Sequence, residues 1–319
     1  MTLAQHVATV AKGSGRARPL TREEAADAMR LMLTGEYPEA TGALLMCLRY
    51  RGETPEEVAG FTEACRTPEW EGIGAALDWP SYAAGRTRGA PLFLAAAILV
   101  ARTGVPVLLH GYNSHQQGAA SVAKALPALG IPVVRSPAAA RDALTLHGIA
   151  YAPLDAVHPG LLRLLKLREA LGLRSCVNTL ARMLNPAGAP AAVQGVFHPP
   201  YRTLQTETAA LLGRTDLAIL KGGGGEFEAN PSKPLDLHGL TGGTPWDEIT
   251  TPTFPARKLH DPDAPMPPPE VALAGNADPF AIACIRLTAA LALRAATKVA
   301  LPEAEARIDV VWLERRTAA

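Results

Sequence analysis

The chain has 319 residues, of which 48% are hydrophobic and 19% are charged. This length and composition predict a folded globular protein with a substantial core and exclude an intrinsically disordered chain. The N-terminus lacks the apolar core of a secretory signal, and the longest apolar run, Ala90–Ala101, is about half of the ~20 residues that a membrane-spanning helix needs. We therefore expect a cytoplasmic protein with no membrane contact, whose four cysteines, without any CxxC pair, are free thiols.

The net charge of +1 conceals an uneven distribution along the chain. Residues 1–78 carry a balance of −4, residues 79–225 a balance of +9, and residues 226–319 a balance of −4. No acidic residue falls between Asp78 and Asp142, although six lysines and arginines do. Such a concentration creates a local positive field, which indicates a surface that binds the phosphates of a nucleotide or a nucleic acid. Scattered surface charges are the alternative interpretation.

The N-terminal part of the chain predicts a short bundle of helices. Thr21 and Glu24 form a capping-box pattern at the start of one helix, in which each side chain bonds the backbone N–H of the other residue. The next helix is expected at Glu39–Tyr50, and Thr54, followed by a proline, begins a third. These patterns predict an N-terminal helical domain over residues 1–78.

From Pro91 onward, helical patterns alternate with short apolar runs. An alternation of this kind predicts a mainly parallel sheet covered by helices. The expected fold class is therefore α/β, with a small N-terminal helical domain and a larger α/β domain at residues 79–319. Residues 229–270, rich in proline and glycine, are expected to be irregular. The predicted helices are Phe93–Arg102, Ser121–Leu129, Leu161–Leu171, Leu204–Leu212 and Pro279–Val299, and the predicted strands are Val105–His110, Ile131–Val134, Ile149–Pro153, Gln194–Phe197, Leu217–Leu220 and Arg307–Leu313.

One stretch of the predicted α/β domain carries a recognisable set of residues. The set comprises His158-Pro159, Leu171-Gly172-Leu173-Arg174, Asn178 and Asn185-Pro186. These residues occur at the spacings found in anthranilate phosphoribosyltransferases, and Val107–Gly111 resembles the VKHGNR motif of that family. The chain therefore resembles this family, which has a glycosyltransferase family 3 fold. The resemblance implies an architecture like that of phosphoribosyltransferases and nucleoside phosphorylases, in which a later helical insertion, here at about residues 158–186, joins the N-terminal helices.

The donor-binding motifs of that family are replaced in this chain. Where the glycine-rich diphosphate loop of the family, GTGGD, is expected, the chain has Asp78–Arg88, which includes the bulky Trp79 and Tyr82. A diphosphate needs small residues and backbone N–H groups packed against it, and Pro80 removes one such donor. Downstream, the apolar Leu92–Ala95 stands where the family has NIST. These replacements argue against anthranilate phosphoribosyl transfer of the kind that the family performs.

A glycine-rich segment, Lys221–Glu228, follows the strand predicted at Leu217–Leu220. Glycines let the backbone approach a phosphate closely, and their N–H groups can surround it. A glycine-rich turn without a ligand is the alternative. The family reads VHGxDGLDE here, so Phe227 replaces the aspartate of the acidic pair that helps to bind magnesium in the family. Loss of this carboxylate weakens a hard-cation site, although Glu226 could substitute for it.

Three segments, DWPSYAAGR, GYNSHQQG and KGGGGEFEANPSKP, resemble one branch of the family, the YbiB-like proteins. This resemblance implies a transferase scaffold that has lost its activity and binds DNA or RNA, single-stranded or duplex, with little sequence preference. It also implies a homodimer through the helical domain and no cofactor or metal. Basic side chains would bind phosphates, and aromatic side chains would stack on bases. The predicted phosphate-binding residues are Arg86, Arg88, Lys124, Arg163, Lys166, Arg168, Arg174, Arg202, Lys221, Gly222, Gly223, Gly224 and Lys233, and the predicted stacking residues are Trp79, Tyr82, Tyr112 and Tyr201.

The competing hypothesis is a phosphoribosyl or pentosyl transferase with an altered donor or acceptor. For such an enzyme the family resemblance implies magnesium with phosphoribosyl diphosphate. Its catalytic residues would be His110, Glu226 and Glu228. His110 can act as an acid or a base near neutral pH, although a histidine at the end of a strand can also be structural. A dimeric protein that uses the scaffold only to bind a partner is a third hypothesis.

Overall fold

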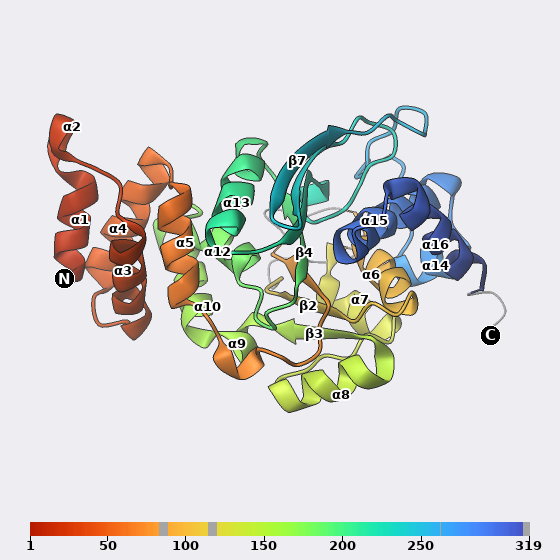
Figure 1. The fold of residues 1–319 in the computed structure, drawn as a ribbon, viewed down its shortest axis with the longest axis horizontal. Helices are drawn as coiled ribbons and strands as arrows, with labels where there is room; N and C mark the ends of the chain where they lie inside the picture. The colour runs from red at the N-terminus through yellow and green to blue at the C-terminus, as the bar shows by residue number, and fades with distance from the viewer. Residues whose placement is uncertain (83–88, 114–119, 262, 315–319) are drawn as a thin grey trace.

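The computed structural model describes residues 1–82, 89–113, 120–261 and 263–314 (Figure 1). A bundle of helices lies at one end of the molecule, and a twisted sheet with helices on both faces forms the rest. The small helical domain and the larger α/β domain predicted from the sequence are both present. The helices of the bundle are α1 (Leu3–Ala11), α2 (Gly13–Arg16), α3 (Arg22–Thr34), α4 (Pro38–Arg51) and α5 (Pro55–Ala64).

The predicted helix starts at Thr21 and Thr54 are confirmed. The Thr21 hydroxyl accepts a hydrogen bond from the Glu24 N–H, and Glu24 Oε2 accepts one from the Thr21 N–H at 2.9 Å. Thr54 and Glu57 form the same reciprocal pair at the start of α5. Glu57 is fully buried, and it also accepts hydrogen bonds from Arg51 at the end of α4 and from the backbone just before α3. One carboxylate therefore holds three helix ends together.

Seven strands form one mixed sheet in the order β3-β2-β1-β4-β5-β6-β7. The first five strands in this order are parallel, and β6 and β7 add an antiparallel hairpin at one edge. The direction in which the chain winds through the sheet reverses between β1 and β4. Such a reversal opens a crevice at the carboxyl ends of parallel strands, where ligands bind. The strands are β1 (Leu77–Ser81), β2 (Val107–Gly111), β3 (Ile149–Pro153), β4 (Ala191–Val196), β5 (Asp216–Lys221), β6 (Asp236–Thr241) and β7 (Thr244–Ile249).

Each face of the sheet has its own hydrophobic core. Val107 and Leu109 of β2 pack into one core with α6 (Phe93–Arg102) and α15 (Pro279–Thr297), whereas Leu108 packs into a second core with the helical bundle. This alternation follows from the two-residue repeat of a strand. The helical bundle and the sheet therefore share a continuous core. The remaining helices are α7 (Val122–Ala128), α8 (Pro137–His147), α9 (Leu154–Val157), α10 (Pro159–Lys166), α11 (Arg168–Leu171), α12 (Val177–Met183), α13 (Pro200–Leu211), α14 (Pro269–Leu273) and α16 (Leu301–Glu314).

Helices α10 and α12 return the chain to the helical bundle, where they pack against α3 and α5 (Figure 1). They lie in the segment for which a helical insertion is predicted, at about residues 158–186. The domain boundary predicted after residue 78 lies inside β1, which begins at Leu77. Residues 65–76, which include a short 3-10 helix at Pro68–Trp70, connect α5 to β1.

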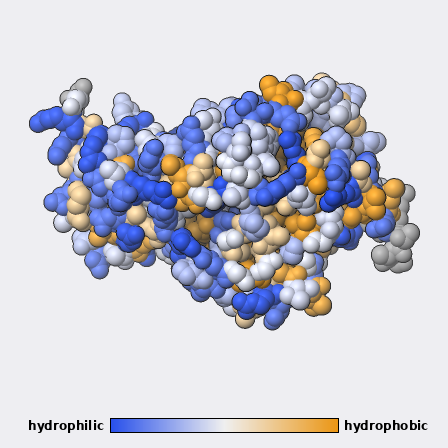
Figure 2. Space-filling view, in the orientation of Figure 1, coloured by the Kyte–Doolittle hydropathy of each residue, from blue (hydrophilic) through white to orange (hydrophobic). Residues whose placement is uncertain are grey.

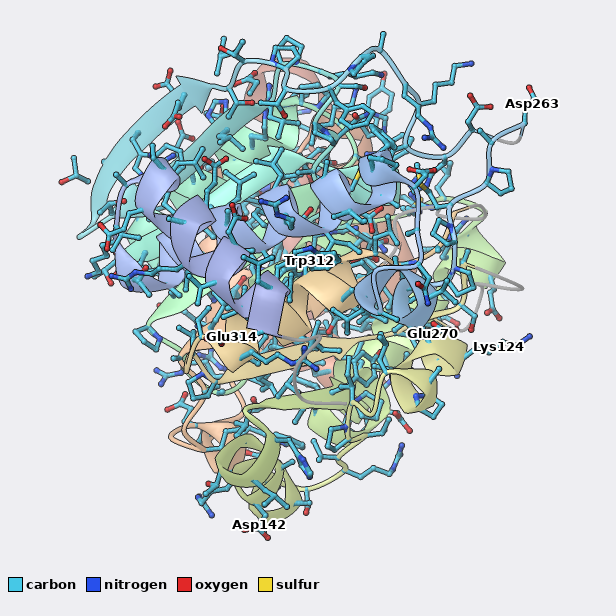
Figure 3. All side chains as sticks on the ribbon, turned by 90° about the vertical axis from the view of Figure 1, so that its right-hand side faces the viewer. Lys124, Asp142, Asp263, Glu270, Trp312 and Glu314 are labelled. Carbon is cyan, nitrogen blue, oxygen red and sulfur yellow. The ribbon has the colours of Figure 1, made fainter. Side chains whose placement is uncertain are left out.

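The strand predicted at Arg307–Leu313 is wrong, because this segment belongs to α16. The buried residues of α16 are Ala304, Ile308 and Trp312, which recur every four positions, as on one face of a helix. Figure 3 shows Trp312 beneath the α16 ribbon, on the side that faces the core. The β-branched residues at positions 308–311 favour a strand locally, and tertiary packing overrides this preference.

The expectation that residues 229–270 are irregular is wrong in part, because β6 and β7 form a hairpin there. Gly242 and Gly243 make its turn, with φ of 58° and 82°, which glycine adopts without strain. The short strand predicted at Ile131–Val134 contributes only an isolated bridge between Val133 and Tyr151. Both differences concern the edges of the sheet, where apolar patterning is weakest.

Within the described residues, α15 is the one helix long and apolar enough to cross a membrane. However, 61% of its apolar segment is buried, and α15 packs against α6, α16, β4 and β5. Its apolar surface therefore belongs to the core.

The four cysteines are free, as predicted, and all but Cys47 are buried. On the face shown in Figure 2, hydrophilic residues predominate over the helical bundle at the left, and apolar residues are interspersed elsewhere.

Replacing Glu57 by alanine is expected to destabilise the folded state by about 2–4 kcal/mol, because Arg51 and two backbone N–H groups lose a buried acceptor. Urea unfolding monitored by circular dichroism measures this free energy. The control, Thr54→Ala, removes only the helix cap and should cost about 1 kcal/mol. Equal losses in the two variants would contradict the anchoring role of Glu57.

Candidate active site

Two cavities open near the carboxyl ends of β4 and β5, one on each side of the first turn of α13. Phe197 and His198, which follow β4, line the first cavity, and the next residue, Pro199, lines the second. Within α13, Tyr201 faces the first cavity and Arg202 the second. This is the edge of the sheet at which the reversal of strand order places a ligand-binding crevice.

Four arginines line the first cavity, which has a volume of about 230 Å³ and which we name the arginine pocket. Arg49 belongs to α4, Arg168 to α11 and Arg182 to α12, and Arg174 lies in the loop between α11 and α12. In the part of the chain that the structure describes, none of the four forms an ion pair with a carboxylate. Like charges around one cavity repel one another, and a bound anion would relieve this repulsion.

The most buried of the four arginines is Arg182, whose side chain reaches the pocket from the core. The Arg182 residue is 6% exposed, and Nη1 donates to the Asn178 carbonyl at 2.8 Å. The buried Nη2 has no hydrogen-bond partner among the described residues. Burial lowers the pKa of Arg182, whereas the charge of Glu226 acts in the opposite direction. Burial and the guanidinium groups of Arg168, Arg182 and Arg49 lower the pKa of Arg174 to about 10. The pocket therefore offers an anionic ligand one buried donor, at Arg182, beside three more accessible guanidinium groups.

Aromatic rings complete the wall of the arginine pocket. Tyr201 is half-buried, and its hydroxyl accepts a hydrogen bond from Arg49 at 3.2 Å. Burial raises the pKa of Tyr201. Phe197 is 46% exposed and packs edge-on against His198, with ring centroids 4.8 Å apart. Planar guanidinium groups beside aromatic rings suit a flat ligand that carries a carboxylate.

Three lysines line the second cavity, which has a volume of about 610 Å³ and which we name the lysine pocket. Lys221, Lys233 and Lys258 are exposed, and no carboxylate of the described residues lies within ion-pair distance of them. Arg202, on the same wall, pairs with Asp236. The pocket therefore presents three uncompensated ammonium groups, a favourable environment for a phosphate.

A tight glycine turn forms one wall of the lysine pocket. A Cβ atom at Gly222 would lie 1.7 Å from the Glu226 carbonyl oxygen, and a Cβ atom at Gly223 would lie 2.6 Å from His260 Nε2. Gly224 has a φ of 66°, in the left-handed region that favours glycine. Only glycine allows the Glu226 carbonyl and the His260 ring to approach so closely, and the wall is therefore tightly packed.

The lysine pocket does not retain the acidic pair of a magnesium site. Phe227 is fully buried, with its ring edge-on against Trp79 and the centroids 5.6 Å apart. Glu228 is 1% exposed; Oε2 accepts a hydrogen bond from the Phe93 N–H at 3.0 Å, and Oε1 lies 3.9 Å from His260 Nε2. Within the described residues, no group of three or more His, Cys, Asp or Glu could hold a metal. These residues do not fit a magnesium-bound diphosphate, which needs uncommitted carboxylates.

His110 lies in the core and lines neither cavity. It is fully buried, with Nδ1 2.9 Å from the Tyr82 hydroxyl and Nε2 3.2 Å from Asp78 Oδ1. Burial raises the pKa of Tyr82 well above its usual range. Glu226 is also fully buried and lines neither cavity. Of the three catalytic residues predicted for an enzyme, Glu228 therefore lines one of these two cavities, and His110 and Glu226 do not.

The residues predicted to bind nucleic acid do not form one surface. Trp79 and Tyr82 are 0% and 2% exposed, so the prediction that they stack on bases is wrong. Arg163 donates to a backbone carbonyl of α3 at 2.5 Å, which attaches α10 to the helical bundle. Lys166 lies 5.8 Å from the centroid of the Tyr112 ring. These contacts are structural, because each connects two elements of the fold.

The other predicted residues divide between the two cavities and a distant helix. Lys124 projects outward from α7, as Figure 3 shows. Arg86 and Arg88 lie outside the described residues. Arg168, Arg174 and Tyr201 line the arginine pocket, whereas Arg202, Lys221, Gly222, Gly223 and Lys233 line the lysine pocket. Gly224 belongs to the same turn without lining either cavity.

Sequence reasoning missed Arg49, Arg182, Lys258 and His260. A signal was available for Arg182, because a single charge in the otherwise uncharged α12 indicates a buried role. No comparable signal marks Arg49, which lies on an exposed helix face, or Lys258, which lies in an irregular segment. Their place at the cavities depends on tertiary packing.

Comparison with known proteins identifies the family. The helical bundle domain of a glycosyl transferase family matches residues 8–67, and the α/β domain of the same family matches residues 91–251. The chain belongs to this glycosyl transferase family. The anthranilate phosphoribosyltransferase of Geobacillus kaustophilus is 31% identical over 295 residues, which cover 88% of this chain and 86% of the relative. That of Mesorhizobium japonicum is 31% identical over 266 residues, or 82% of this chain and 77% of the relative.

Solved structures of the family have the same fold. The anthranilate phosphoribosyltransferase of Thermus thermophilus is 25% identical, with a TM-score of 0.76 over 100% of this chain and 99% of that chain. The enzyme of Saccharomyces cerevisiae in complex with PRPP and Mg is 17% identical, with a TM-score of 0.76 over 98% of this chain and 95% of that chain. At 17% identity this likeness concerns the fold alone.

The prediction of a nucleic-acid-binding protein is wrong. Relatives that align with most of the chain are named as phosphoribosyltransferases, and none of the matches described above is a nucleic-acid-binding protein. The basic residues on which the prediction depended lie largely at two separate cavities. These findings favour the competing hypothesis, a transferase with an altered donor or acceptor.

Replacing Arg168 by glutamine is expected to stabilise the unliganded protein by about 0.3–1 kcal/mol, because it removes one of four mutually repelling charges. The melting temperature of the purified variant measures this change. Arg141→Gln is the matched control, because Arg141 is an exposed arginine of α8 that lines neither cavity. A lower melting temperature for the Arg168 variant, with the control unchanged, would contradict repulsion in the arginine pocket.

Proposed function

We propose that this protein transfers a pentosyl group from a phosphorylated donor to a small aromatic acid held in the arginine pocket. The observation that carries this proposal is the buried, unpartnered Nη2 of Arg182 beside three further guanidinium groups. A buried N–H without an acceptor costs about 1–3 kcal/mol, so its retention indicates that a ligand supplies the acceptor. Membership of the glycosyl transferase family supports the reaction class.

The acceptor class follows from the walls of the arginine pocket. A carboxylate can accept two parallel hydrogen bonds from one guanidinium group, which fixes both its position and its plane. The rings of Phe197 and Tyr201 provide apolar contact for a flat ring. The name of the relatives, anthranilate phosphoribosyltransferase, supports an aromatic acid that also carries an amine. A cavity of about 230 Å³ suits a molecule of this size.

The donor phosphate would lie in the lysine pocket, across the first turn of α13. In the reaction, the bond from the pentose C1 to the phosphate oxygen breaks, and a bond from C1 to the amine nitrogen of the acceptor forms. The phosphate leaves with the electron pair of the broken bond, and the three lysines stabilise its charge. The amine loses one proton, and His198, on the turn between the two cavities, is suited to accept it.

Arg174→Gln is expected to raise the KM for the acceptor about 10–100-fold, because a charge-assisted hydrogen bond contributes about 1.5–3 kcal/mol. The reaction would contain anthranilate and a mixture of pentose phosphates and diphosphates, with and without Mg²⁺. Mass spectrometry would detect a product heavier than anthranilate by one pentosyl unit.

The control for this experiment is again Arg141→Gln, which changes the net charge of the protein by the same amount at a residue outside the pocket. Absence of a pentosyl product with every donor would reject the proposed function. A product formed equally well by the Arg174 variant would reject the arginine pocket as the acceptor site.

The homodimer through the helical domain and the cytoplasmic location stay predictions.

A further inference from the structure

We propose that the lysine pocket binds the phosphate of its donor without a divalent cation. This inference rests on the proposed function for the identity of the donor, and it concerns how the donor phosphate is neutralised. The ligand chemistry is a phosphate group held by ammonium groups beside a glycine-rich wall. A phosphate monoester and a diphosphate ester both carry such a group, and the experiment below distinguishes them.

The charges that line the lysine pocket carry the first part of the argument. Lys221, Lys233 and Lys258 have no carboxylate of the described residues within ion-pair distance. The guanidinium group of Arg202 is compensated by Asp236. Three ammonium groups provide the positive charge that a divalent cation would otherwise bring to a phosphate, and lysine binds phosphate as a mobile point charge.

The position of Glu228 carries the second part. A carboxylate that binds a cation must direct at least one oxygen at that cation. Glu228 instead directs Oε2 at the Phe93 N–H, at the first residue of α6, where the helix dipole favours a negative charge. Withdrawal of this oxygen toward a metal would break a buried hydrogen bond. Glu228 therefore stabilises the start of α6 and leaves the lysines uncompensated.

Phe227 carries the third part, because it occupies the place of a second carboxylate next to Glu228. Its side chain is fully buried and packs edge-on against Trp79, which is also fully buried. An aromatic pair of this kind supplies no oxygen ligand, and magnesium binds to oxygen. The segment thus brings one carboxylate to the pocket, Glu228, in place of a pair, and Phe227 is fixed in the core.

The backbone of the glycine turn carries the last part. Gly222 and Gly223 line the lysine pocket next to Lys221, and neither position has room for a Cβ atom. The Glu226 carbonyl oxygen and the His260 ring fill the space beside these glycines, so the turn is a tightly packed wall next to Lys221. The lysine side chains therefore bind a phosphate against this wall without a metal.

Isothermal titration of the full-length protein with inorganic phosphate and, separately, with pyrophosphate tests the inference. Each titration is made in EDTA and again in excess Mg²⁺. We expect binding in EDTA, with affinities in the two conditions that agree within about threefold. Tighter binding of phosphate indicates a monoester donor, and tighter binding of pyrophosphate indicates a diphosphate donor. Binding that requires Mg²⁺ would overturn the inference.

Lys221→Met and Lys233→Met should each weaken phosphate binding about tenfold, which corresponds to about 1.4 kcal/mol. Lys12→Met is the matched control, because Lys12 is exposed at the far end of the helical bundle (Figure 1). Unchanged binding in both pocket variants would overturn the inference.

A pentosyl product that forms only with Mg²⁺ would also overturn the inference, while the proposed function stands. Metal-free phosphate binding without any pentosyl product would reject the proposed function alone.

Discussion

Repulsion among four guanidinium groups around one cavity is the constraint on which the rest of the site depends. Arg49 comes from the helical bundle, and the other three come from the segment that returns to the bundle from the sheet. Their proximity therefore requires that both parts of the molecule pack as one unit, which the shared hydrophobic core and the anchoring of three helix ends by Glu57 achieve. Holding like charges around one cavity raises the free energy of the unliganded protein, and a bound anion removes this penalty and so gains affinity.

The carboxylates near the two cavities are directed elsewhere. Glu57 bonds Arg51 and helix ends, Glu228 bonds the start of α6, and Asp78 lies beside His110 in the core. Apart from Arg202, which pairs with Asp236, the cations that line the two cavities consequently stay available to ligands. A single turn, between β4 and α13, separates the two cavities, so an acceptor and a phosphate can be held on its two sides. This arrangement suits a transfer reaction, because both reactants must be bound at once.

The sequence predicted most of the fold, and it predicted the site only in part. Helix caps at Thr21 and Thr54 and the alternation of strands and helices are local patterns, so they were readable. The α16 segment was misassigned because its β-branched residues favour a strand, whereas packing against the core decides the outcome. The basic residues were recognised as phosphate binders, yet their division into two cavities, and the burial of Trp79, depend on contacts between distant segments. The nucleic-acid prediction failed because net charge shows the sign of a surface and not its shape.

The central claim is that the arginine and lysine pockets hold the acceptor and the donor phosphate at the same time. Titration of the wild-type protein with anthranilate, before and after saturation with inorganic phosphate, tests this claim most directly. The account predicts one anthranilate per chain in both titrations, with an affinity that saturating phosphate leaves equal or increases. Displacement of anthranilate by phosphate would show that the two ligands share one site, and it would contradict the account.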